Sequence, residues 1–350
     1  MDAHDLDTPA LYVDLDALER NIARMQERCR AWGVALRPHV KTHKISEIAQ
    51  LQLAAGAIGI TVAKVGEAEV LPGDDVLIAY PLVKAKLPRV RELAKTRRVK
   101  VAVDSVEVAR DLQRIETLVE IDVGVGRTGA QSPEQAVEIA RACSDSNFRG
   151  IFYWPSWLDE AGFRAACVKI DAVLAALARV GFEAKIVSGG STPGAAKTPL
   201  IPQTTEIRPG TYVFYDASSL AAKLCVEADC ALRVLTTVVS TAVPGQCVID
   251  AGSKTFSSDQ TVGVGTFGHF IGHAWTMRKL NEEHGYVEPH PLTPSPSGRG
   301  GTNREPRVGE KVWVVPSHVC ATVNLHDEVW YGRRGRVEGS WKVAARGKVR

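Results

Sequence analysis

The sequence predicts an α/β protein in which a (β/α)8 barrel is followed by a smaller all-β domain. Eight short apolar runs rich in β-forming residues alternate with helical stretches between residues 36 and 216. After residue 230 the chain becomes β-rich, with Pro-Gly and Gly turns and no long helical pattern. A doubly wound open sheet gives a similar alternation, and periodicity alone does not separate the two folds.

Length and composition narrow the class of protein. The 350 residues are 45% hydrophobic and 24% charged, which is enough for one large domain and one smaller one. The net charge of +3 and the lack of a basic stripe interleaved with aromatics argue against a nucleic-acid partner. The sequence shows no membrane-spanning run, no signal pattern at its acidic start and no CxxC pair among its seven cysteines. We therefore expect a cytoplasmic protein with reduced thiols and no membrane partner.

The apolar runs mark the expected barrel strands. They cover residues 36–41, 58–64, 75–82, 99–105, 117–124, 148–154, 184–190 and 207–216. We expect residues 1–20 to form an N-terminal segment that packs with the β-domain, 21–230 to form the barrel and 231–350 to form the β-domain. Within the latter, residues 288–307 are rich in Pro, Ser, Gly and Arg, a composition typical of an exposed, disordered loop.

The first run, LRPHVK, carries three polar side chains that share one face if it is a strand. Arg37, His39 and Lys41 then point into the barrel, which is costly unless they bind something. Lys41 ends the run at the carboxyl rim, where barrel enzymes place their chemistry. Neighbouring cations favour the neutral amine that an imine-forming lysine needs, so Lys41 and His39 are the catalytic candidates and Arg37 is a candidate cofactor contact. A buried ion-pair network is the alternative interpretation.

Other lysines and strand ends supply further candidates. Lys44 lies past the first strand and is expected to face solvent, whereas Lys64 ends the second run and is placed to act as an electrostatic helper. Asp122 and Arg127 follow the fifth run, and three side chains lie on the eighth: Tyr212, Tyr215 and Asp216.

The motif SGGSTPG follows the seventh run. Four of its residues can offer backbone N–H groups or hydroxyls to a phosphate, which barrels often hold after strands seven and eight: Gly189, Gly190, Ser191 and Thr192. A short glycine run alone is weak evidence for a phosphate site, but its position after the seventh strand strengthens this evidence. A Schiff-base lysine combined with a phosphate site predicts pyridoxal 5′-phosphate as cofactor.

PSHVCATVNLHDE in the second domain is a candidate metal site. In an extended strand, His318 and Cys320 lie on one face and can bind the same ion. Imidazole and thiolate favour zinc, and two protein ligands leave positions open for water and substrate, as in catalytic sites. Manganese and magnesium are the alternatives. A buried cysteine beside a surface histidine gives the same short pattern. His326 and Asp327 are either supporting partners of the site or a turn.

Five motifs in this order resemble the D-threonine aldolase/D-serine dehydratase family: RPHVKTHK, EIDVGVGRTG, SGGSTP, EIRPGTYVF and PSHVCATVNLHDE. Its members are pyridoxal-phosphate enzymes of the alanine racemase-like fold, and the resemblance covers nearly the whole chain. It implies that Lys41 forms the imine and that His318 and Cys320 bind a metal. It also implies phosphate contacts from residues 189–192 and Tyr212, a place near the cofactor ring for Arg127, and a homodimer.

The chain departs from the family pattern at two sites. Aldolases of the family often carry aspartate where this chain has Cys320, and cysteine there is more like the D-serine dehydratase branch. Relatives also carry a histidine shortly after the tyrosine of the sixth strand, whereas this chain has Pro155, Ser156 and Trp157 in that region. A candidate base is therefore missing.

These features predict a lyase that acts on a D-β-hydroxy-α-amino acid. The chain is most like the low-specificity D-threonine aldolase-like members, so retro-aldol cleavage to glycine and an aldehyde is the leading interpretation. A dehydratase of D-serine or D-3-hydroxyaspartate type, which gives a 2-oxo acid and ammonia, is the alternative. An amino-acid racemase fits less well because it gives the metal pair no role. The second domain argues against a non-catalytic pyridoxal-phosphate carrier, whereas the missing histidine keeps an inactive enzyme as an alternative.

Overall fold

The computed structural model describes residues 1–143, 147–289 and 305–350. They form two compact units. The barrel unit comprises Ala23–Lys41, Ser46–Gly210 and Lys348–Arg350, and the β-sheet unit comprises Met1–Ile22, Thr42–Ile45 and Thr211–Gly347. Residues 290–304, which make up most of the expected loop at 288–307, lie outside the described residues.

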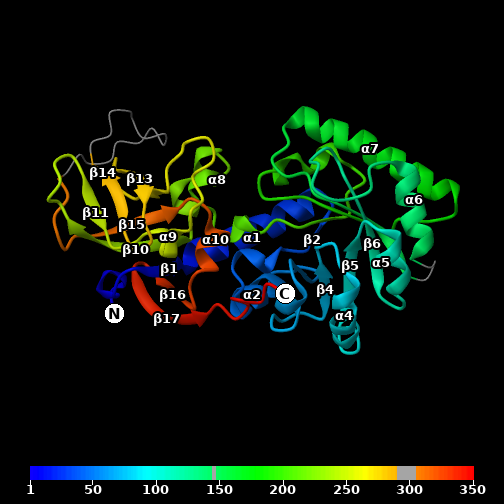
Figure 1. The fold of residues 1–350 in the computed structure, drawn as a ribbon, viewed down its shortest axis with the longest axis horizontal. Helices are drawn as coiled ribbons and strands as arrows, with labels where there is room; N and C mark the ends of the chain where they lie inside the picture. The colour runs from blue at the N-terminus through cyan, green and yellow to red at the C-terminus, as the bar shows by residue number, and fades with distance from the viewer. Residues whose placement is uncertain (144–146, 290–304) are drawn as a thin grey trace. The chain divides into compact units, whose positions relative to one another are not determined.

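An eight-stranded parallel sheet forms the barrel unit, as predicted (Figure 1). Its strand order is β2-β9-β8-β7-β6-β5-β4-β3, and a bridge between His39 and Thr61 joins the segment after β2 to β3. The strands are β2 (Ala35–Leu36), β3 (Ile60–Val62), β4 (Asp75–Ile78), β5 (Arg98–Val103), β6 (Glu116–Ile121), β7 (Phe148–Tyr153), β8 (Ile186–Gly189) and β9 (Glu206–Ile207). This parallel arrangement brings the carboxyl ends of all eight strands to one rim.

Helices follow most of these strands. They are α2 (Ser46–Ala54), α3 (Val65–Ala68), α4 (Leu87–Leu93), α5 (Val106–Asp111), α6 (Pro133–Ala142) and α7 (Glu160–Arg179), with the 3-10 helices η3 (Lys84–Lys86) and η4 (Ala195–Leu200). Helix α7 begins where the Asp159 side chain accepts the Gly162 N–H. Its apolar residues recur every three or four positions and are buried, including Phe163, Ile170 and Leu177. This stripe explains why the sequence forms a covering helix here.

Four adjacent strands supply one buried side chain each to a shared apolar cluster. These side chains are Leu77, Ala102, Leu118 and Phe152, from β4, β5, β6 and β7. Continuous apolar runs of this kind are typical of parallel strands that are covered on both faces. The cluster therefore accounts for the hydrophobic character that marks these strands in the sequence.

The β-sheet unit is built mainly of strands, which confirms the predicted β-rich domain. The strands are β1 (Ala10–Asp14), β10 (Leu232–Ser240), β11 (Cys247–Ile249), β12 (Gly268–Phe270), β13 (Thr276–Leu280), β14 (Gly285–Glu288), β15 (Lys311–Pro316), β16 (Glu328–Arg333) and β17 (Arg336–Lys342). β1 pairs antiparallel with β10 and parallel with β16. The N-terminal segment is thus a central strand of this sheet.

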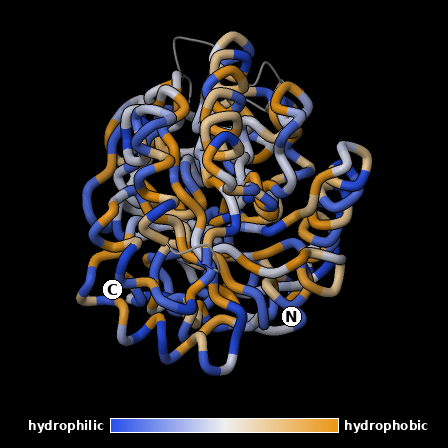
Figure 2. Tube along the Cα trace, turned by 90° about the vertical axis from the view of Figure 1, so that its right-hand side faces the viewer, coloured by the Kyte–Doolittle hydropathy of each residue, from blue (hydrophilic) through white to orange (hydrophobic). Residues whose placement is uncertain are grey.

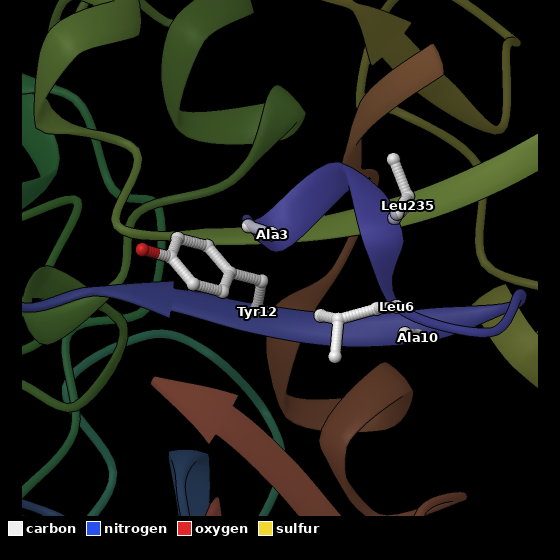
Figure 3. Packing of buried hydrophobic residues seen from close by; sticks show 5 residues of the cluster. All are labelled: Ala3, Leu6, Ala10, Tyr12 and Leu235. Atoms are coloured by element: carbon white, nitrogen blue, oxygen red, sulfur yellow. The ribbon is translucent and has the colours of Figure 1, made fainter. Parts of the chain in front are cut away.

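Short helices connect the strands of this unit, and one longer helix is shared. They are η1 (Ala3–Asp5), η5 (Thr211–Val213), α8 (Ala217–Ala221), η6 (Glu227–Asp229), α9 (Ser253–Phe256) and α10 (Val319–Val323), while α1 (Leu15–Ala31) and η2 (Val40–Thr42) have residues in both units. An apolar cluster fixes the start of the chain on the sheet (Figure 3); its members are Ala3, Leu6, Ala10, Tyr12 and Leu235.

Hydrophobic and hydrophilic residues alternate along much of the chain trace (Figure 2). Within the residues that the structure describes, no helix has both the length and the apolar character needed to cross a membrane.

The prediction is wrong for two of the expected barrel strands, because most of the residues in each are not in a strand. The run 36–41 is a strand only at Leu36, because Pro38 has no N–H to donate and the chain winds into η2 from Val40. The run 207–216 is a strand only at Ile207, again before a proline, Pro209. Alternation of side chains along a strand therefore cannot be used to orient the residues that follow.

Candidate functional site

A glycine turn at the carboxyl end of β8 forms a backbone cradle. A Cβ on Gly189 would lie 1.9 Å from Tyr153 Cζ, and Gly190 has φ +89° with a Cβ position 2.9 Å from Ile207 Cβ. The next residue is locked, because the Ser191 hydroxyl donates to the Ser156 carbonyl (2.9 Å) and accepts the Gly194 N–H (3.1 Å). The turn that the sequence predicts for a phosphate is therefore buried and closely packed, with no room for a Cβ at Gly189 or Gly190.

Arg208, which the sequence analysis missed, is buried beside this turn. Its Nη1 donates to Ser188 Oγ (2.6 Å), its Nη2 donates to the Tyr153 carbonyl (2.7 Å), and its guanidinium lies 3.7 Å from the Phe152 ring centroid. Burial lowers the pKa of Arg208 to about 10. Among the described residues no carboxylate lies within salt-bridge distance of it. A buried arginine without a carboxylate is unusual and indicates a place for an anion or a ring acceptor.

Lys41 lies in η2 with an exposed side chain. Among the described residues its Nζ has no hydrogen bond or ion pair. The two rival lysines are already engaged. Lys64 Nζ lies 3.5 Å from the Tyr80 ring centroid. Lys44 is buried, and its Nζ donates to Asn324 Oδ1 (2.7 Å), so the expectation that it faces solvent is wrong. Lys41 is thus the one of the three whose amine is uncommitted within the described chain.

Arg37 belongs to a buried ion-pair network. Its Nη1 contacts Asp75 Oδ1 at 2.6 Å and its Nε contacts Glu206 Oε1 at 3.1 Å. Lys100, also buried, contacts Asp75 Oδ1 at 2.6 Å. Asp75 and Glu206 are the first residues of β4 and β9, so the network lies at the amino ends of the strands. For Arg37 these contacts agree with the alternative interpretation, a buried ion-pair network, and we therefore do not assign Arg37 to the cofactor.

Arg127 follows β6 in a segment of turns. Its Nη2 lies 3.5 Å from Glu120 Oε1, and its guanidinium lies 4.0 Å from the Trp154 ring centroid. The Thr128 hydroxyl also donates to Glu120 Oε1 (2.7 Å), while burial raises the pKa of Glu120. Asp122 accepts three backbone N–H groups of its own turn. Asp122 is therefore a structural residue of the turn that presents Arg127.

The two candidate metal ligands lie at the start of α10. The expected extended strand is wrong, because β15 ends at Pro316, His318 occupies the N-cap position and Cys320 lies in the first helical turn. The two side chains nevertheless share a hydrogen bond. This hydrogen bond, helped by the one to Asp259, raises the pKa of His318 to about 9, although burial of the imidazole acts to lower it. His318 Nδ1 lies 2.6 Å from Asp259 Oδ2.

Two threonine hydroxyls lie near the Cys320 sulfur, and a buried acid, Asp216, interacts with His318. The Cys320 thiol donates to Thr42 Oγ1 (3.3 Å) and lies 3.9 Å from Thr211 Oγ1. Thr42 is the next residue in the chain after Lys41. Asp216 is buried, accepts the Ser219 N–H (2.8 Å) and has a raised pKa because of its burial, with the charge of His318 opposing that shift. Asp259 and Thr42 are distant in sequence from the HVC motif, so no local pattern could reveal them.

Several other predicted residues have defined contacts. His326 Nε2 donates to the Thr255 carbonyl (3.1 Å), and Asp327 pairs with Arg346 (2.6 Å), so these two residues belong to a turn. Tyr212 is fully buried in η5, and the His39 N–H donates to the Pro209 carbonyl (3.0 Å).

The segment after β7 lacks the histidine that relatives carry. Ser156 has φ +48°, and its carbonyl accepts the hydrogen bond from the Ser191 hydroxyl. About half of the Trp157 side chain is exposed. The residues in the expected place of this base are therefore a proline, a serine and a tryptophan, none of which has a side chain that titrates near neutral pH.

The residues present fit both the pyridoxal phosphate and the metal ion that the sequence predicts. The cradle at Gly189 and Gly190 leaves the backbone open to a phosphate, and the Lys41 amine is available for a covalent bond. His318 and Cys320 offer nitrogen and sulfur donors of the kind that zinc prefers. The described residues contain no group of three or more His, Cys, Asp or Glu side chains suited to a metal ion.

Comparison with known proteins gives the same division of the chain. The family model described as the alanine racemase N-terminal domain matches residues 13–218, and the one described as a putative serine dehydratase domain matches residues 231–331. 3-Hydroxy-D-aspartate aldolase of Paracoccus denitrificans strain Pd 1222 is 33% identical over 99% of this chain and 94% of its own length. D-threo-3-hydroxyaspartate dehydratase of Delftia sp. strain HT23 is 34% identical over 91% of this chain and 92% of its own length.

Solved structures agree with these relatives. D-threonine aldolase from Filomicrobium marinum superimposes with a TM-score of 0.87 at 32% identity, covering 99% of this chain and 98% of its own. A cysteine-to-alanine variant of D-threo-3-hydroxyaspartate dehydratase in a metal-free form superimposes with a TM-score of 0.85 at 30% identity, covering 98% of each chain. On these similarities, the chain belongs to the D-threonine aldolase/D-serine dehydratase family, whose members have the alanine racemase-like fold.

Proposed function

We propose that this protein is a pyridoxal-phosphate- and divalent-metal-dependent lyase that cleaves a D-β-hydroxy-α-amino acid. The leading reaction is the D-threonine aldolase type, a retro-aldol cleavage to glycine and an aldehyde. Dehydration of a D-serine or D-3-hydroxyaspartate type of substrate is the alternative, and relatives of both kinds align with nearly the whole chain. A cytoplasmic location and a homodimer stay predictions from the sequence.

The observation that carries this proposal is the arrangement of His318, Cys320 and Asp259. A racemase has no use for a metal, whereas both lyase reactions act on a β-hydroxyl that a metal can bind. Asp259 accepts a hydrogen bond from Nδ1 of His318, which orients the imidazole so that its other nitrogen would be the metal donor. The sulfur of Cys320 is hydrogen-bonded to this same histidine. Zinc is the metal that suits this nitrogen and sulfur pair, with manganese and magnesium as alternatives.

The cofactor would be held mainly by residues of the barrel unit. Lys41 would carry it covalently, and the backbone of residues 189–192 would bind its phosphate, with Tyr212 as a further contact. Arg127 and the buried Arg208 would face its ring. When bound, pyridoxal phosphate supplies an electron sink for charge at the substrate Cα, and the metal supplies Lewis-acid activation of the substrate oxygen.

The two reactions differ in which proton the chain must move. The aldolase reaction needs a base for the β-hydroxyl proton, and Pro155, Ser156 and Trp157 provide none. In that reaction the chain's own role would be to hold the metal through His318 and Cys320, and the metal would supply Lewis-acid activation of the β-hydroxyl. The dehydratase reaction needs a base for the proton on Cα instead, and the amine of Lys41 would fit that role. His39 stays a second candidate for proton transfer.

Product analysis with D-threonine as sole substrate tests the proposal. Glycine and acetaldehyde identify the aldolase, whereas 2-oxobutyrate and ammonia identify the dehydratase. D-serine and D-3-hydroxyaspartate are tested in parallel, because a narrow substrate range would leave D-threonine untouched. Absence of product from all three, with a cofactor-loaded protein, would overturn the proposed function and favour an inactive binding protein.

A further inference from the structure

A cavity of about 330 Å³ lies within the β-sheet unit, apart from the residues assigned above. It is lined by residues from α8, the segment that follows it as far as the start of η6, the 261–266 segment, β12 and the start of β13. Its volume is at the lower end of the range for small-molecule sites, which matches a ligand of about the size of an amino acid.

Two opposite charges face this cavity. Lys223 lines it and is exposed, and among the described residues its Nζ has no hydrogen bond or ion pair. Its backbone has φ +56°, a left-handed conformation that directs the chain around the cavity. Glu227 Oε2 lies 2.7 Å from His269 Nε2, which holds the carboxylate in place and leaves Oε1 for another donor. The cavity thus offers one free cation and one oriented carboxylate.

The rest of the lining combines apolar side chains with the hydroxyls of Thr261, Thr266 and Thr276. Leu220, Val226, Val264 and the buried Trp275 supply hydrocarbon or aromatic surface, and the hydroxyl-bearing Thr276 adds a polar group. A few polar groups within an apolar wall are the usual composition of a specific small-molecule site.

We propose that this cavity binds a small α-amino acid with an aliphatic side chain. Its carboxylate would pair with Lys223, its ammonium with Glu227, and its side chain would lie against Val226 and Val264. A simple anion would be repelled by Glu227, and a simple amine would be repelled by Lys223. A zwitterion satisfies both charges, and the apolar wall selects an aliphatic side chain over a charged one.

The lining elements also connect to the candidate metal ligands. Helix α8 begins at the N-cap residue Asp216, and the Thr261 hydroxyl is within 2.8 Å of Ser317 Oγ, next to His318. A ligand that contacts both elements can therefore alter the surroundings of His318, and metal binding must alter its affinity in return. This coupling rests on the proposed function, whereas amino-acid binding to the cavity does not.

The test is equilibrium dialysis of the full-length holoprotein with radiolabelled L-leucine. We expect saturable binding of one leucine per chain, at least tenfold weaker in Lys223→Gln and abolished in Ala221→Trp, which places a bulky ring at the cavity wall. Ala222→Trp is the matched control, because Ala222 is exposed at the end of the same helix and does not line the cavity. Far-ultraviolet circular dichroism checks that each variant is folded.

Two leucine analogues test the zwitterion directly. 4-Methylpentanoate lacks the ammonium group and isoamylamine lacks the carboxylate, and each should bind at least tenfold more weakly than leucine. Unchanged leucine binding in both cavity variants, no saturable binding to the wild type, or equal binding of 4-methylpentanoate would overturn the proposal. The cofactor absorption spectrum, recorded in the same samples, separates binding at Lys41 from binding in the cavity. An inactive protein that still binds leucine would refute the proposed function alone.

Discussion

Asp259 Oδ2 lies 2.6 Å from Nδ1 of His318, although 58 residues separate them in the chain. A carboxylate on the far nitrogen of an imidazole fixes its tautomer and raises its basicity as a metal ligand. Asp259 is therefore assigned a positioning role, one step removed from the ion that His318 and Cys320 are proposed to hold. This relationship leads to the first prediction.

Replacing Asp259 with asparagine should weaken metal affinity by about 10- to 100-fold, because the imidazole loses its charged hydrogen-bond acceptor. Competition with a chromophoric chelator measures this affinity without reference to activity. Glu283→Gln is the matched control, since that carboxylate pairs with Lys254 on an exposed surface of the same unit. Equal metal affinities for the Asp259→Asn and Glu283→Gln variants would show that Asp259 does not support the metal site.

Lys41 should be the residue that carries the cofactor. Borohydride reduction of the holoprotein, followed by proteolysis and mass spectrometry, should add the pyridoxyl group to the peptide that contains Lys41. Lys41→Ala should lose this label, whereas Lys64→Ala should keep it because Lys64 is held over Tyr80. A label on Lys44 or Lys64 in the wild type would show that the assignment is wrong.

Arg37 should matter for stability more than for cofactor binding. Arg37→Ala leaves Glu206 and part of Asp75 without their buried partner, which should lower the free energy of unfolding by about 3–5 kcal/mol. Urea denaturation measures this loss. Arg164→Ala is the comparison, because its i,i+4 pair with Glu160 is exposed and should change stability by less than about 0.5 kcal/mol. A folded, fully stable Arg37→Ala protein that no longer binds cofactor would reverse this assignment.

Glu116 should make the stability of the barrel sensitive to acid. Its burial opposes ionisation, but hydrogen bonds from Arg98 and Arg149 outweigh burial and lower the pKa of Glu116 to about 2. Because the folded-state pKa is below the unfolded value, this stabilisation is fully present above about pH 5 and is lost as the pH falls towards 2. It amounts to about 3 kcal/mol at most.

Urea denaturation of the wild type and Glu116→Gln at a series of pH values checks this prediction. The difference between their free energies of unfolding should be constant from pH 7 to about pH 5 and should shrink steadily below it. A difference that does not depend on pH would mean that the carboxylate is not stabilised by its neighbours.

Much of the fold could be predicted from the sequence because its signals are local. Apolar runs such as 98–103 and amphipathic helices such as α7 carry their periodicity within a few residues. The prediction was wrong where proline interrupts a run, as at Pro38 and Pro209. In both places the chain leaves the sheet after two strand residues.

The candidate site was predictable only in part. The HVC motif and the glycine turn are compact in sequence, but HVC begins a helix at His318 instead of continuing a strand. Lys44 was expected at the surface because nothing nearby in sequence reveals Asn324, its partner 280 residues away. Arg208 and Asp259 were missed for the same reason, since their partners come from other strands and loops.

The measurement that tests the central claim most directly is activity after metal removal and controlled restoration. The protein is treated with a chelator, and product formation from the substrate identified above is followed as zinc or manganese is returned. The proposal predicts no turnover without metal, recovery at about one ion per chain, and no recovery in His318→Ala or Cys320→Ala. Full activity in the metal-free wild type, with cofactor still bound, would contradict it.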